Sequence, residues 1–257
     1  MLLCITEKCS MGCSHCIDNA KPDGRHMTLE TLEKALDFII KNNAYHSIIV
    51  TGGETTEHPA FPFFMGYIIG ELAKRNLTSM VTVLTNGFWL LESEENLKCA
   101  KQMVQGSKNV HVQFQVSTDE RFYPKKLDTT KRIWREKGFV LCKDCVEQVY
   151  PMGRAKINNI PWQAKASKCF NIRALAKQLP NPTIESVVMA LLMKMKFCTP
   201  MIRIDGGISL GESTLCPICA SIYDDEKDII QKIKDFKCDG CSEINDKLPM
   251  LYKQFVL

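Results

Sequence analysis

Short apolar runs alternate with longer amphipathic stretches along the first 142 residues of the chain. A run such as residues 48–50 is too short for a helix and is typical of a strand covered on both sides. Between such runs, apolar residues recur at helical spacing, as in the stretch that follows the candidate N-cap Thr28. Strands are predicted at 1–6, 47–51, 79–85, 109–118 and 138–142, and helices at 28–42, 61–76, 93–105 and 125–137. One strand roughly every 30 residues, with helices between, predicts a parallel βα sheet.

The strand predicted at 109–118 differs from the others in its strict alternation of apolar and polar residues. The apolar positions are Val110, Val112, Phe114 and Val116, and the polar ones are His111, Gln113, Gln115 and Ser117. A parallel strand buried on both faces does not alternate in this way, so one face would pack on helices and the other would line a wet interior. This favours a curved or incomplete barrel, with Gln113, Gln115, Ser117 and Asp119 on its inner wall. The alternative is an antiparallel strand with one face in water.

Past residue 149 the βα rhythm fades, and prolines interrupt the chain. Residues 201–204 and 208–210, joined through Asp205-Gly206-Gly207, predict a hairpin closed by an Asp-Gly turn. Residues 224–237 repeat apolar positions at helical spacing. We therefore expect a core domain over residues 1–160, followed over 161–257 by linker helices and a small cysteine-rich module.

The composition is that of an ordinary globular protein, with 45% hydrophobic and 24% charged residues among 257, which excludes disordered and fibrous classes. A formal net charge of +4 neither demands nor forbids nucleic acid. The apolar stretch at 187–193 has seven residues, too few to span a bilayer, so no membrane partner is expected. The N-terminus reaches the acidic Glu7 too early for a signal peptide, so a cytoplasmic protein is expected.

The chain contains 13 cysteines, and without an export signal such cysteines bind metals more often than they form disulfides. Cys9, Cys13 and Cys16 form a C-x3-C-x2-C pattern directly after the first predicted strand. Cys4 and Cys99 lie inside apolar or helical patterns and are predicted to be core residues. Three C-x2-C pairs follow further along the chain, namely Cys142/Cys145, Cys216/Cys219 and Cys238/Cys241.

Three cysteine ligands leave one position of a metal centre open, whereas structural zinc sites and ordinary 4Fe–4S sites have four protein ligands. The C-x3-C-x2-C spacing resembles the signature of the radical S-adenosylmethionine (SAM) superfamily. In that family three cysteines hold a 4Fe–4S cluster, and the amino and carboxylate groups of SAM bind the fourth iron. The resemblance implies that Cys9, Cys13 and Cys16 hold such a cluster and that SAM binds to it.

Further motifs of the family follow in its order, at the ends of predicted strands. Gly52-Gly53-Glu54 is similar to the motif that holds the SAM amino group, and residues 84–87 resemble a Thr-Asn-Gly segment. Residues 116–119 resemble the fourth-strand motif that reaches the ribose, and residues 153–155 resemble a Gly-Arg-Ala segment of peptide-modifying members. Taken singly, such motifs are also typical of tight turns and helix caps. Together they imply that the SAM contacts come from His15, Gly52, Gly53, Glu54, Asn86, Ser117 and Asp119.

The fold implied by the resemblance is a partial (β/α)6 barrel, an α/β architecture that gathers ligands at the C-terminal ends of its strands. The chemistry it implies is reductive cleavage of SAM to methionine and a 5′-deoxyadenosyl radical, which abstracts hydrogen from a substrate. An electron donor such as flavodoxin or ferredoxin is implied as well. The protein's part is to orient the reactants and to exclude water and competing quenchers.

The C-terminal cysteines have two interpretations. Cys216, Cys219, Cys238 and Cys241 fit the spacing of a zinc ribbon. By resemblance, Cys198 with Cys216, Cys238 and Cys241 would instead hold an auxiliary 4Fe–4S cluster in a twitch module, the shortened relative of the SPASM domain. This second interpretation leaves Cys219 spare.

The remaining cysteines have no assigned role. Cys142, Cys145 and Cys169 could bind a further metal with a fourth ligand such as Cys219, or pack in the core. One thiol could instead donate a hydrogen atom to a substrate radical, and Cys169 and Cys219 are the candidates for that role.

The substrate implied by a SPASM or twitch extension is a ribosomally made precursor peptide, modified by a crosslink, a thioether or an epimerisation. A small molecule such as a sugar, an alcohol or a cofactor precursor is the alternative. RNA is a third candidate, because residues 125–137 are rich in Lys and Arg, although such a segment is usually a solvated face. A non-catalytic iron–sulfur or zinc scaffold is the alternative outside enzymes.

Overall fold

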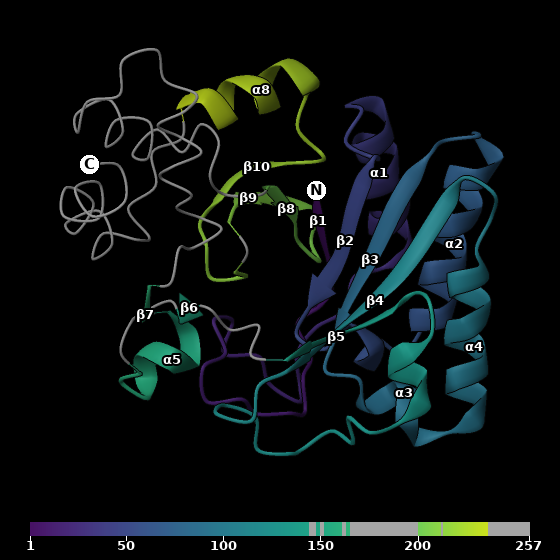
Figure 1. The fold of residues 1–257 in the computed structure, drawn as a ribbon. Helices are drawn as coiled ribbons and strands as arrows, with labels where there is room; N and C mark the ends of the chain where they lie inside the picture. The colour runs from purple at the N-terminus through teal and green to yellow at the C-terminus, as the bar shows by residue number, and fades with distance from the viewer. Residues whose placement is uncertain (144–147, 150–151, 161–162, 165–199, 212, 236–257) are drawn as a thin grey trace, which may run out of the picture.

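The computed structural model describes residues 1–143, 148–149, 152–160, 163–164, 200–211 and 213–235 (Figure 1). Strands and helices alternate in its first half, as the sequence predicts. In chain order this half contains β1 (Leu2–Thr6), α1 (Leu29–Lys41), β2 (Ser47–Gly52), η1 (Thr55–Glu57), α2 (Phe61–Lys74), β3 (Ser79–Thr85), α3 (Phe88–Glu92), α4 (Glu94–Gln105), β4 (Val110–Thr118), η2 (Arg132–Arg135) and β5 (Phe139–Lys143). The later described elements are β6 (Gln148–Val149), α5 (Gly153–Ile157), β7 (Gln163–Ala164), β8 (Pro200–Ile202), β9 (Gly207–Leu210), β10 (Ile218–Ser221) and α8 (Glu226–Asp235).

The largest sheet of the described chain has eight strands in the order β10-β9-β8-β1-β2-β3-β4-β5. The strands from β8 to β5 in this order are parallel to their neighbours, whereas β9 and β10 run antiparallel. The register brings the ends of neighbouring strands together, with Thr85 of β3 beside Val116 of β4. The predicted α/β fold is confirmed, and the open, mostly parallel sheet is consistent with a partial barrel.

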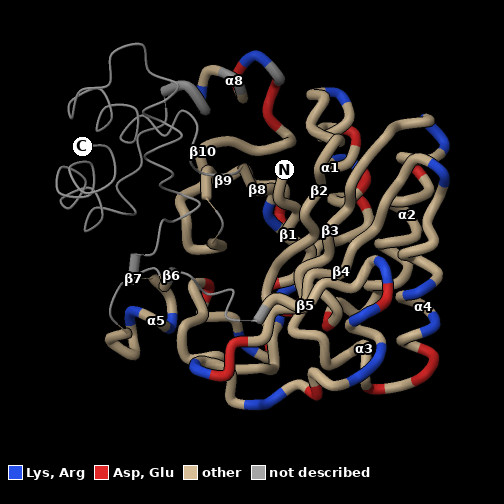
Figure 2. Tube along the Cα trace, viewed as in Figure 1, with Lys and Arg blue, Asp and Glu red and all other residues tan. Residues whose placement is uncertain are grey.

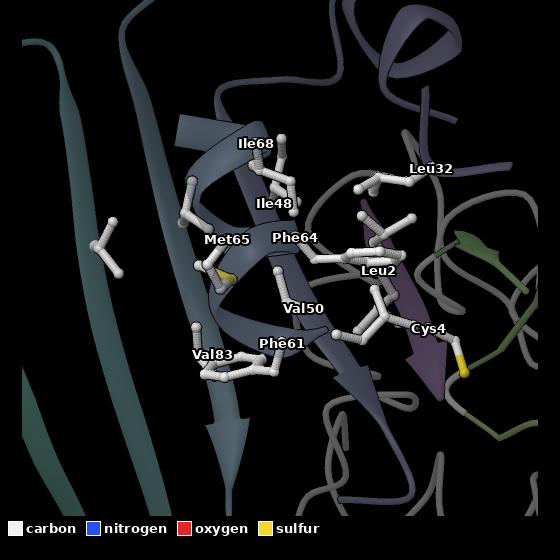
Figure 3. Close-up of a cluster of buried hydrophobic side chains, with 14 of the residues drawn as sticks. Leu2, Cys4, Leu32, Ile48, Val50, Phe61, Phe64, Met65, Ile68 and Val83 are labelled. Carbon is white, nitrogen blue, oxygen red and sulfur yellow. The ribbon is translucent and has the colours of Figure 1, made fainter. Parts of the chain in front are cut away.

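Helices cover one face of this sheet and bury its apolar side chains. Figure 3 shows Phe61, Met65 and Ile68 of α2 beside Val50 of β2 and Val83 of β3, and all five side chains are fully buried. Helix α4 lies next to α2 and packs on β4 (Figure 1). Close packing of this kind fixes the strand ends that carry the predicted motifs.

β4 has the two faces that its sequence predicts. Its apolar residues Val110, Val112, Phe114 and Val116 are buried, and the polar residues His111, Gln113, Gln115 and Ser117 are partly or fully exposed. The apolar face meets the helices, where the rings of Phe114 and Phe61 lie 6.5 Å apart. Because β4 is parallel to both β3 and β5, the alternative of a half-exposed antiparallel strand is wrong. Its polar face is the one turned away from the helix layer.

One predicted helix is absent from the described chain, because residues 125–137 are irregular except for η2. The Asp128 carboxylate accepts hydrogen bonds from the Thr130 backbone N–H at 3.0 Å and from its hydroxyl at 2.6 Å. The indole N–H of Trp134 donates to the Asp128 carbonyl at 2.8 Å. These local bonds replace those of a helix, so the helix prediction for this segment is wrong.

Lys and Arg residues are interspersed with Asp and Glu along the described chain (Figure 2). In the basic segment, Lys126 pairs with Glu120 at 2.9 Å and Lys131 with Asp128 at 3.6 Å. Such exposed pairs are typical of a solvated face. None of the described helices is both long and apolar enough to cross a bilayer.

The predicted hairpin of the C-terminal part is present as β8 and β9. Arg203 donates its backbone N–H to the Gly207 carbonyl at 2.8 Å, and Gly206 donates to the Arg203 carbonyl at 2.9 Å. β8 also pairs in parallel with β1. The described residues of the cysteine-rich part therefore continue the sheet that begins in the N-terminal part.

Candidate functional site

Cys9, Cys13 and Cys16 lie in the loop that leaves the C-terminal end of β1. We call residues 9–21 the cysteine loop. The backbone N–H of Cys9 donates to the Lys21 carbonyl at 2.9 Å, so the loop closes at its base, and Cys16 donates to the Cys13 carbonyl at 3.3 Å in a tight turn. This folding brings all three thiols to one end of the parallel strands.

The three thiols share one electrostatic neighbourhood. Burial raises the pKa of the Cys9 thiol to about 11 and that of the Cys13 thiol to about 12, and the charges of Cys9 and Cys16 contribute to the rise at Cys13. Within the described residues, no three His, Cys, Asp or Glu side chains are gathered closely enough to chelate a metal ion. Cysteine binds a metal as the thiolate. Three such thiols on one short loop are a donor set that fits an iron–sulfur cluster with an open position.

Close contact between β1 and the end of β2 explains the Gly-Gly pair. A Cβ on Gly52 would lie 2.1 Å from the Thr6 carbonyl oxygen, and one on Gly53 would lie 2.3 Å from that of Lys8. Gly53 donates its N–H to Thr6 at 2.8 Å, and Glu54 donates to Lys8 at 2.7 Å. The two glycines therefore let two backbones meet, which places Glu54 directly beside the start of the cysteine loop.

The buried Glu54 carboxylate ties the end of β2 to the end of β3. Its Oε1 accepts hydrogen bonds from the hydroxyls of Thr85 at 2.6 Å and Thr56 at 2.7 Å, and from the Thr56 N–H at 3.2 Å. Its Oε2 accepts from the Asn86 N–H at 2.7 Å. Burial raises the pKa of Glu54, and these hydrogen bonds oppose the rise. Oε2 keeps one acceptor lone pair beyond this network.

Asn86, Ser117 and Asp119 lie around one narrow crevice together with Met11 of the cysteine loop. The predicted residues at the ends of β3 and β4 are therefore brought together. Asp119 is buried and receives two hydrogen bonds from the Arg121 guanidinium, at 2.8 and 2.6 Å, which lower its pKa. The Asp119 carboxylate is thus held by Arg121, whereas the Ser117 hydroxyl lies on the accessible face of β4.

His15 packs against the segment that follows β4. Its ring stacks on Phe122 with centroids 4.6 Å apart and meets the edge of Tyr123 at 5.7 Å. The Ser14 N–H donates to the Phe122 carbonyl at 3.1 Å, which fixes the two segments together. Burial lowers the pKa of His15 to about 4, so the ring is neutral at pH 7. Its Nδ1 is buried without a hydrogen-bond partner among the described residues, and a bound ligand commonly satisfies such a group.

A cleft of about 530 Å³ adjoins the Glu54 network. Its volume is within the range of small-molecule and cofactor sites. Ser10 of the cysteine loop forms part of its wall and donates its N–H and hydroxyl to Glu57 at 2.8 and 2.7 Å. The lining residues are Ser10, Glu54, Thr56, Glu57, Asn86, Phe88, Trp89, Leu91 and Glu92. The cleft thus connects the cysteine loop with the ends of β2 and β3.

The remaining predicted cysteines are only partly covered by the structure. Cys216 is buried after β9, where its N–H donates to the Ser213 carbonyl at 3.0 Å. Cys219 lies on β10, and its thiol donates to the Ile208 carbonyl at 3.3 Å. Outside the described residues lie Cys145, Cys169, Cys198, Cys238 and Cys241. The auxiliary-cluster and hydrogen-donor roles of these cysteines stay predictions.

Arg154 of α5 contacts the cysteine loop, and sequence reasoning gave it no role. Its Nη1 donates to the Cys13 carbonyl at 2.9 Å, and its Nη2 donates to the Ala20 carbonyl. Its charge also opposes the rise in the pKa of Cys13. The Gly-Arg-Ala resemblance was the signal that marked this segment, but a contact so distant along the chain has no sequence pattern of its own.

Comparisons with known proteins agree with the motifs. The family model described as "Radical SAM superfamily" matches residues 3–147. The chain is 30% identical over 102 residues to the antilisterial bacteriocin subtilosin biosynthesis protein AlbA of Bacillus subtilis (strain 168). That match covers 39% of this chain and 21% of AlbA, so the chain spans only part of this relative's length.

A solved structure has a similar fold. The crystal structure of BtrN in complex with AdoMet and 2-DOIA matches with a TM-score of 0.54 and 13% sequence identity, and covers 97% of this chain and 86% of that one. The family match itself covers more than half of the chain, including the cysteine loop and the ends of β2, β3 and β4. The chain belongs to the radical SAM superfamily, whose members are enzymes that depend on a 4Fe–4S cluster and SAM.

Proposed function

We propose that this chain abstracts a hydrogen atom from a ribosomally made precursor peptide, so that the peptide acquires a crosslink, a thioether or an epimerised residue. The observation that carries the proposal is the cysteine loop, which offers three thiols at the end of β1. Glu54, Asn86 and Ser117, at the ends of the next strands, lie around the clefts that adjoin the loop.

In this proposal Cys9, Cys13 and Cys16 hold the cluster as thiolates. When bound, a reduced cluster would supply one electron for the cleavage of SAM to methionine and a 5′-deoxyadenosyl radical, which would take a hydrogen atom from the substrate. The protein residues would bind and orient SAM. The spare lone pair of Glu54 Oε2 would accept from the SAM amino group, and the Ser117 hydroxyl would be available to the ribose.

His15 and its neighbours supply the apolar side of the proposed SAM site. The ring of His15 is neutral at pH 7 because burial lowers its pKa to about 4, and it is held in a stack with Phe122. Aromatic surface of this kind would shield a reactive carbon radical from competing hydrogen donors. The unpartnered Nδ1 of His15 offers one polar contact within that surface.

A peptide substrate is supported by the match to AlbA, a protein named for bacteriocin biosynthesis. The test is anaerobic reconstitution of the full chain with iron and sulfide, followed by SAM, dithionite and the precursor peptide encoded beside it. We expect 5′-deoxyadenosine to form faster with the peptide than without it, and the peptide to change mass. A variant with Cys9, Cys13 and Cys16 all changed to Ala is the control and should form none.

The outcomes of this experiment separate the possible substrates. If the peptide neither accelerates 5′-deoxyadenosine formation nor changes mass, the peptide proposal is wrong. Oxidation of a small sugar or alcohol to a ketone would favour a small-molecule dehydrogenase instead. Replacing dithionite by reduced flavodoxin or ferredoxin tests the proposed electron donor in the same assay.

We also propose an auxiliary 4Fe–4S cluster on Cys198, Cys216, Cys238 and Cys241. Quantitation of iron, sulfide and zinc distinguishes this proposal from a zinc ribbon, because only the ribbon uses Cys219. Cys219→Ala should keep about eight irons per chain, and Cys216→Ala should keep about four. Zinc that is lost in Cys219→Ala would instead establish the ribbon.

A further inference from the structure

Most of the backbone hydrogen bonds of the cysteine loop are made with residues outside the loop. No helix or strand lies between β1 and α1 among the described residues, so the carbonyls of the loop need partners from elsewhere. Two distant segments supply them. Arg154 donates from Nη1 to the Cys13 carbonyl at 2.9 Å, from Nη2 to the Ala20 carbonyl, and from its backbone N–H to the Cys16 carbonyl at 2.8 Å. Asn158 Nδ2 donates to the Ser14 carbonyl at 2.9 Å, and Ser213 Oγ donates to the Ile17 carbonyl at 3.1 Å.

Arg154 makes several of these contacts at once. Its guanidinium reaches the carbonyl of Cys13, near the middle of the loop, and that of Ala20, near its end, and its Nε donates to the Asn19 side-chain oxygen at 3.4 Å. A guanidinium holds its N–H donors in a rigid planar fork, and hydrogen bonds from a charged donor are the stronger ones. A lysine ammonium is a single point and cannot span these acceptors.

Gly153, directly before Arg154, allows α5 to approach the cysteine loop closely. Gly153 has a φ of +53°, and a Cβ there would lie 2.4 Å from the Ile17 carbonyl oxygen and 2.6 Å from that of Cys16. Any side chain would push α5 away from the loop, and glycine adopts a positive φ without strain. Ala155 is fully buried. Contact with the cysteine loop therefore accounts for Gly153 and Arg154 of the Gly-Arg-Ala segment.

We propose that Arg154 is a positioning residue that holds the cysteine loop in the shape in which it binds the iron–sulfur cluster. It acts through the carbonyls of the loop, while the sulfur atoms make the bonds to iron. The inference rests on the proposed function in one respect, namely that the loop binds a cluster. The arrangement of Arg154 and the loop can be tested without the cluster.

The first measurement is hydrogen exchange of the full chain without cluster, in the wild type and in Arg154→Met, Arg154→Lys and Asn158→Ala. In Arg154→Met we expect exchange in peptides from residues 9–21 to be faster by about tenfold or more, because several charge-assisted hydrogen bonds are lost. Arg154→Lys keeps the charge without the fork, so we expect it to exchange nearly as fast. Asn158→Ala loses one contact and should have a smaller effect in the same peptides.

The second measurement is iron release to a chelator from the reconstituted protein, together with the electron paramagnetic resonance spectrum of the reduced cluster with and without SAM. Arg154→Met should release iron about tenfold faster and show an altered SAM-induced change of the spectrum. Arg75→Met is the matched control. Arg75 pairs with Asp37 and Glu71 on the helix surface, and this variant should behave as the wild type.

The outcomes distinguish failure of the positioning role of Arg154 from failure of the proposed function. Wild-type exchange in the loop of Arg154→Met, or faster exchange along the whole chain, would overturn the positioning role. Iron release and a spectrum like those of the wild type would overturn it as well. If the wild type binds no iron, the proposed function fails, and the exchange experiment still tests the contact between Arg154 and the loop.

Discussion

The Glu54 carboxylate is the residue on which most of the site geometry depends. It is 4% exposed and accepts four hydrogen bonds, which come from Thr56, Thr85 and Asn86. A buried carboxylate costs free energy unless such donors compensate it. The residue therefore braces β2 against β3 in addition to any contact with SAM. This structural role could not be predicted from the Gly-Gly-Glu motif, because the donors Thr85 and Asn86 lie at the end of another strand.

The variant Glu54→Gln tests the brace. An amide keeps the shape but has only one acceptor oxygen, so its NH2 group must face the backbone N–H of either Thr56 or Asn86. We expect the free energy of unfolding to fall by about 1–3 kcal/mol, measured by urea unfolding of the protein without cluster. Glu92→Gln, exposed in the same cleft, is the control and should change it by less than about 0.5 kcal/mol. Equal stability of Glu54→Gln and wild type would contradict the brace.

At the scale of elements, His58 joins η1 to the start of α2. Its Nδ1 accepts the Ala60 N–H at 3.1 Å, which assigns the proton to Nε2, and Nε2 donates to the Met27 carbonyl at 3.0 Å. Burial lowers the pKa of His58 below 6.5, and the same cause lowers that of its neighbour His26. A proton on Nδ1 would remove the acceptor of the Ala60 N–H.

The pH dependence of stability follows from this geometry. Below about pH 6.5 the unfolded chain binds protons at His15, His58 and His26 that the folded chain does not bind, so stability is lost as the pH falls toward the lowered folded values. Each histidine contributes at most about 1.4 kcal/mol per pH unit. Urea midpoints between pH 7.5 and 5 should therefore decrease, and less steeply in His58→Gln. The exposed His111→Gln should keep the wild-type profile, and a flat wild-type profile would contradict this account.

Sequence patterns predicted most elements of the first half of the chain, because an element that is buried on one face has apolar residues at a regular spacing. Thr28 caps α1 as predicted, accepting the Thr31 N–H at 3.2 Å, and β4 alternates as predicted. The irregular segment at 125–137 has helical composition, but the side chain of Asp128 binds its own neighbours instead. The short helix α3 has no periodicity long enough to be recognised. Local hydrogen bonds of this kind override weak propensities.

In the candidate site, too, features set by local sequence could be predicted, and contacts between residues far apart in the sequence could not. Motifs that lie at strand ends, such as Gly52-Gly53-Glu54, could be placed because parallel strands bring their C-terminal ends together. The engagement of Asp119 by Arg121 could not be predicted, since Ser-Thr-Asp is equally suited to a helix cap. The support from Arg154 spans more than 100 residues of sequence. Contacts at that distance are decided by packing, which a single sequence does not display.

At the scale of the whole molecule, the described residues that follow β9 form hydrogen bonds with the cysteine loop, in addition to the strand pairing of β8 with β1. Asp18, two residues beyond Cys16, is half-buried and accepts hydrogen bonds from the Thr214 N–H at 2.5 Å and its hydroxyl at 3.0 Å. Burial raises the pKa of Asp18, and the bonds from Thr214 and Ser213 oppose the rise. The segment after β9 and the loop that we propose to bind the cluster are therefore parts of one hydrogen-bonded unit.

This coupling predicts that a change at Asp18 loosens two segments that are far apart in the sequence. Asp18→Asn replaces a charged acceptor by a neutral amide oxygen, which weakens both hydrogen bonds from Thr214, so we expect stability to fall by about 1–3 kcal/mol. Hydrogen exchange should become faster both in residues 9–21 and in residues 207–221. Asp224→Asn is the matched control, because Asp224 accepts the Ser221 N–H at 2.8 Å and pairs with Lys232 within the C-terminal part alone. It should affect only that part, and faster exchange confined to residues 9–21 in Asp18→Asn would show that the two segments are not coupled.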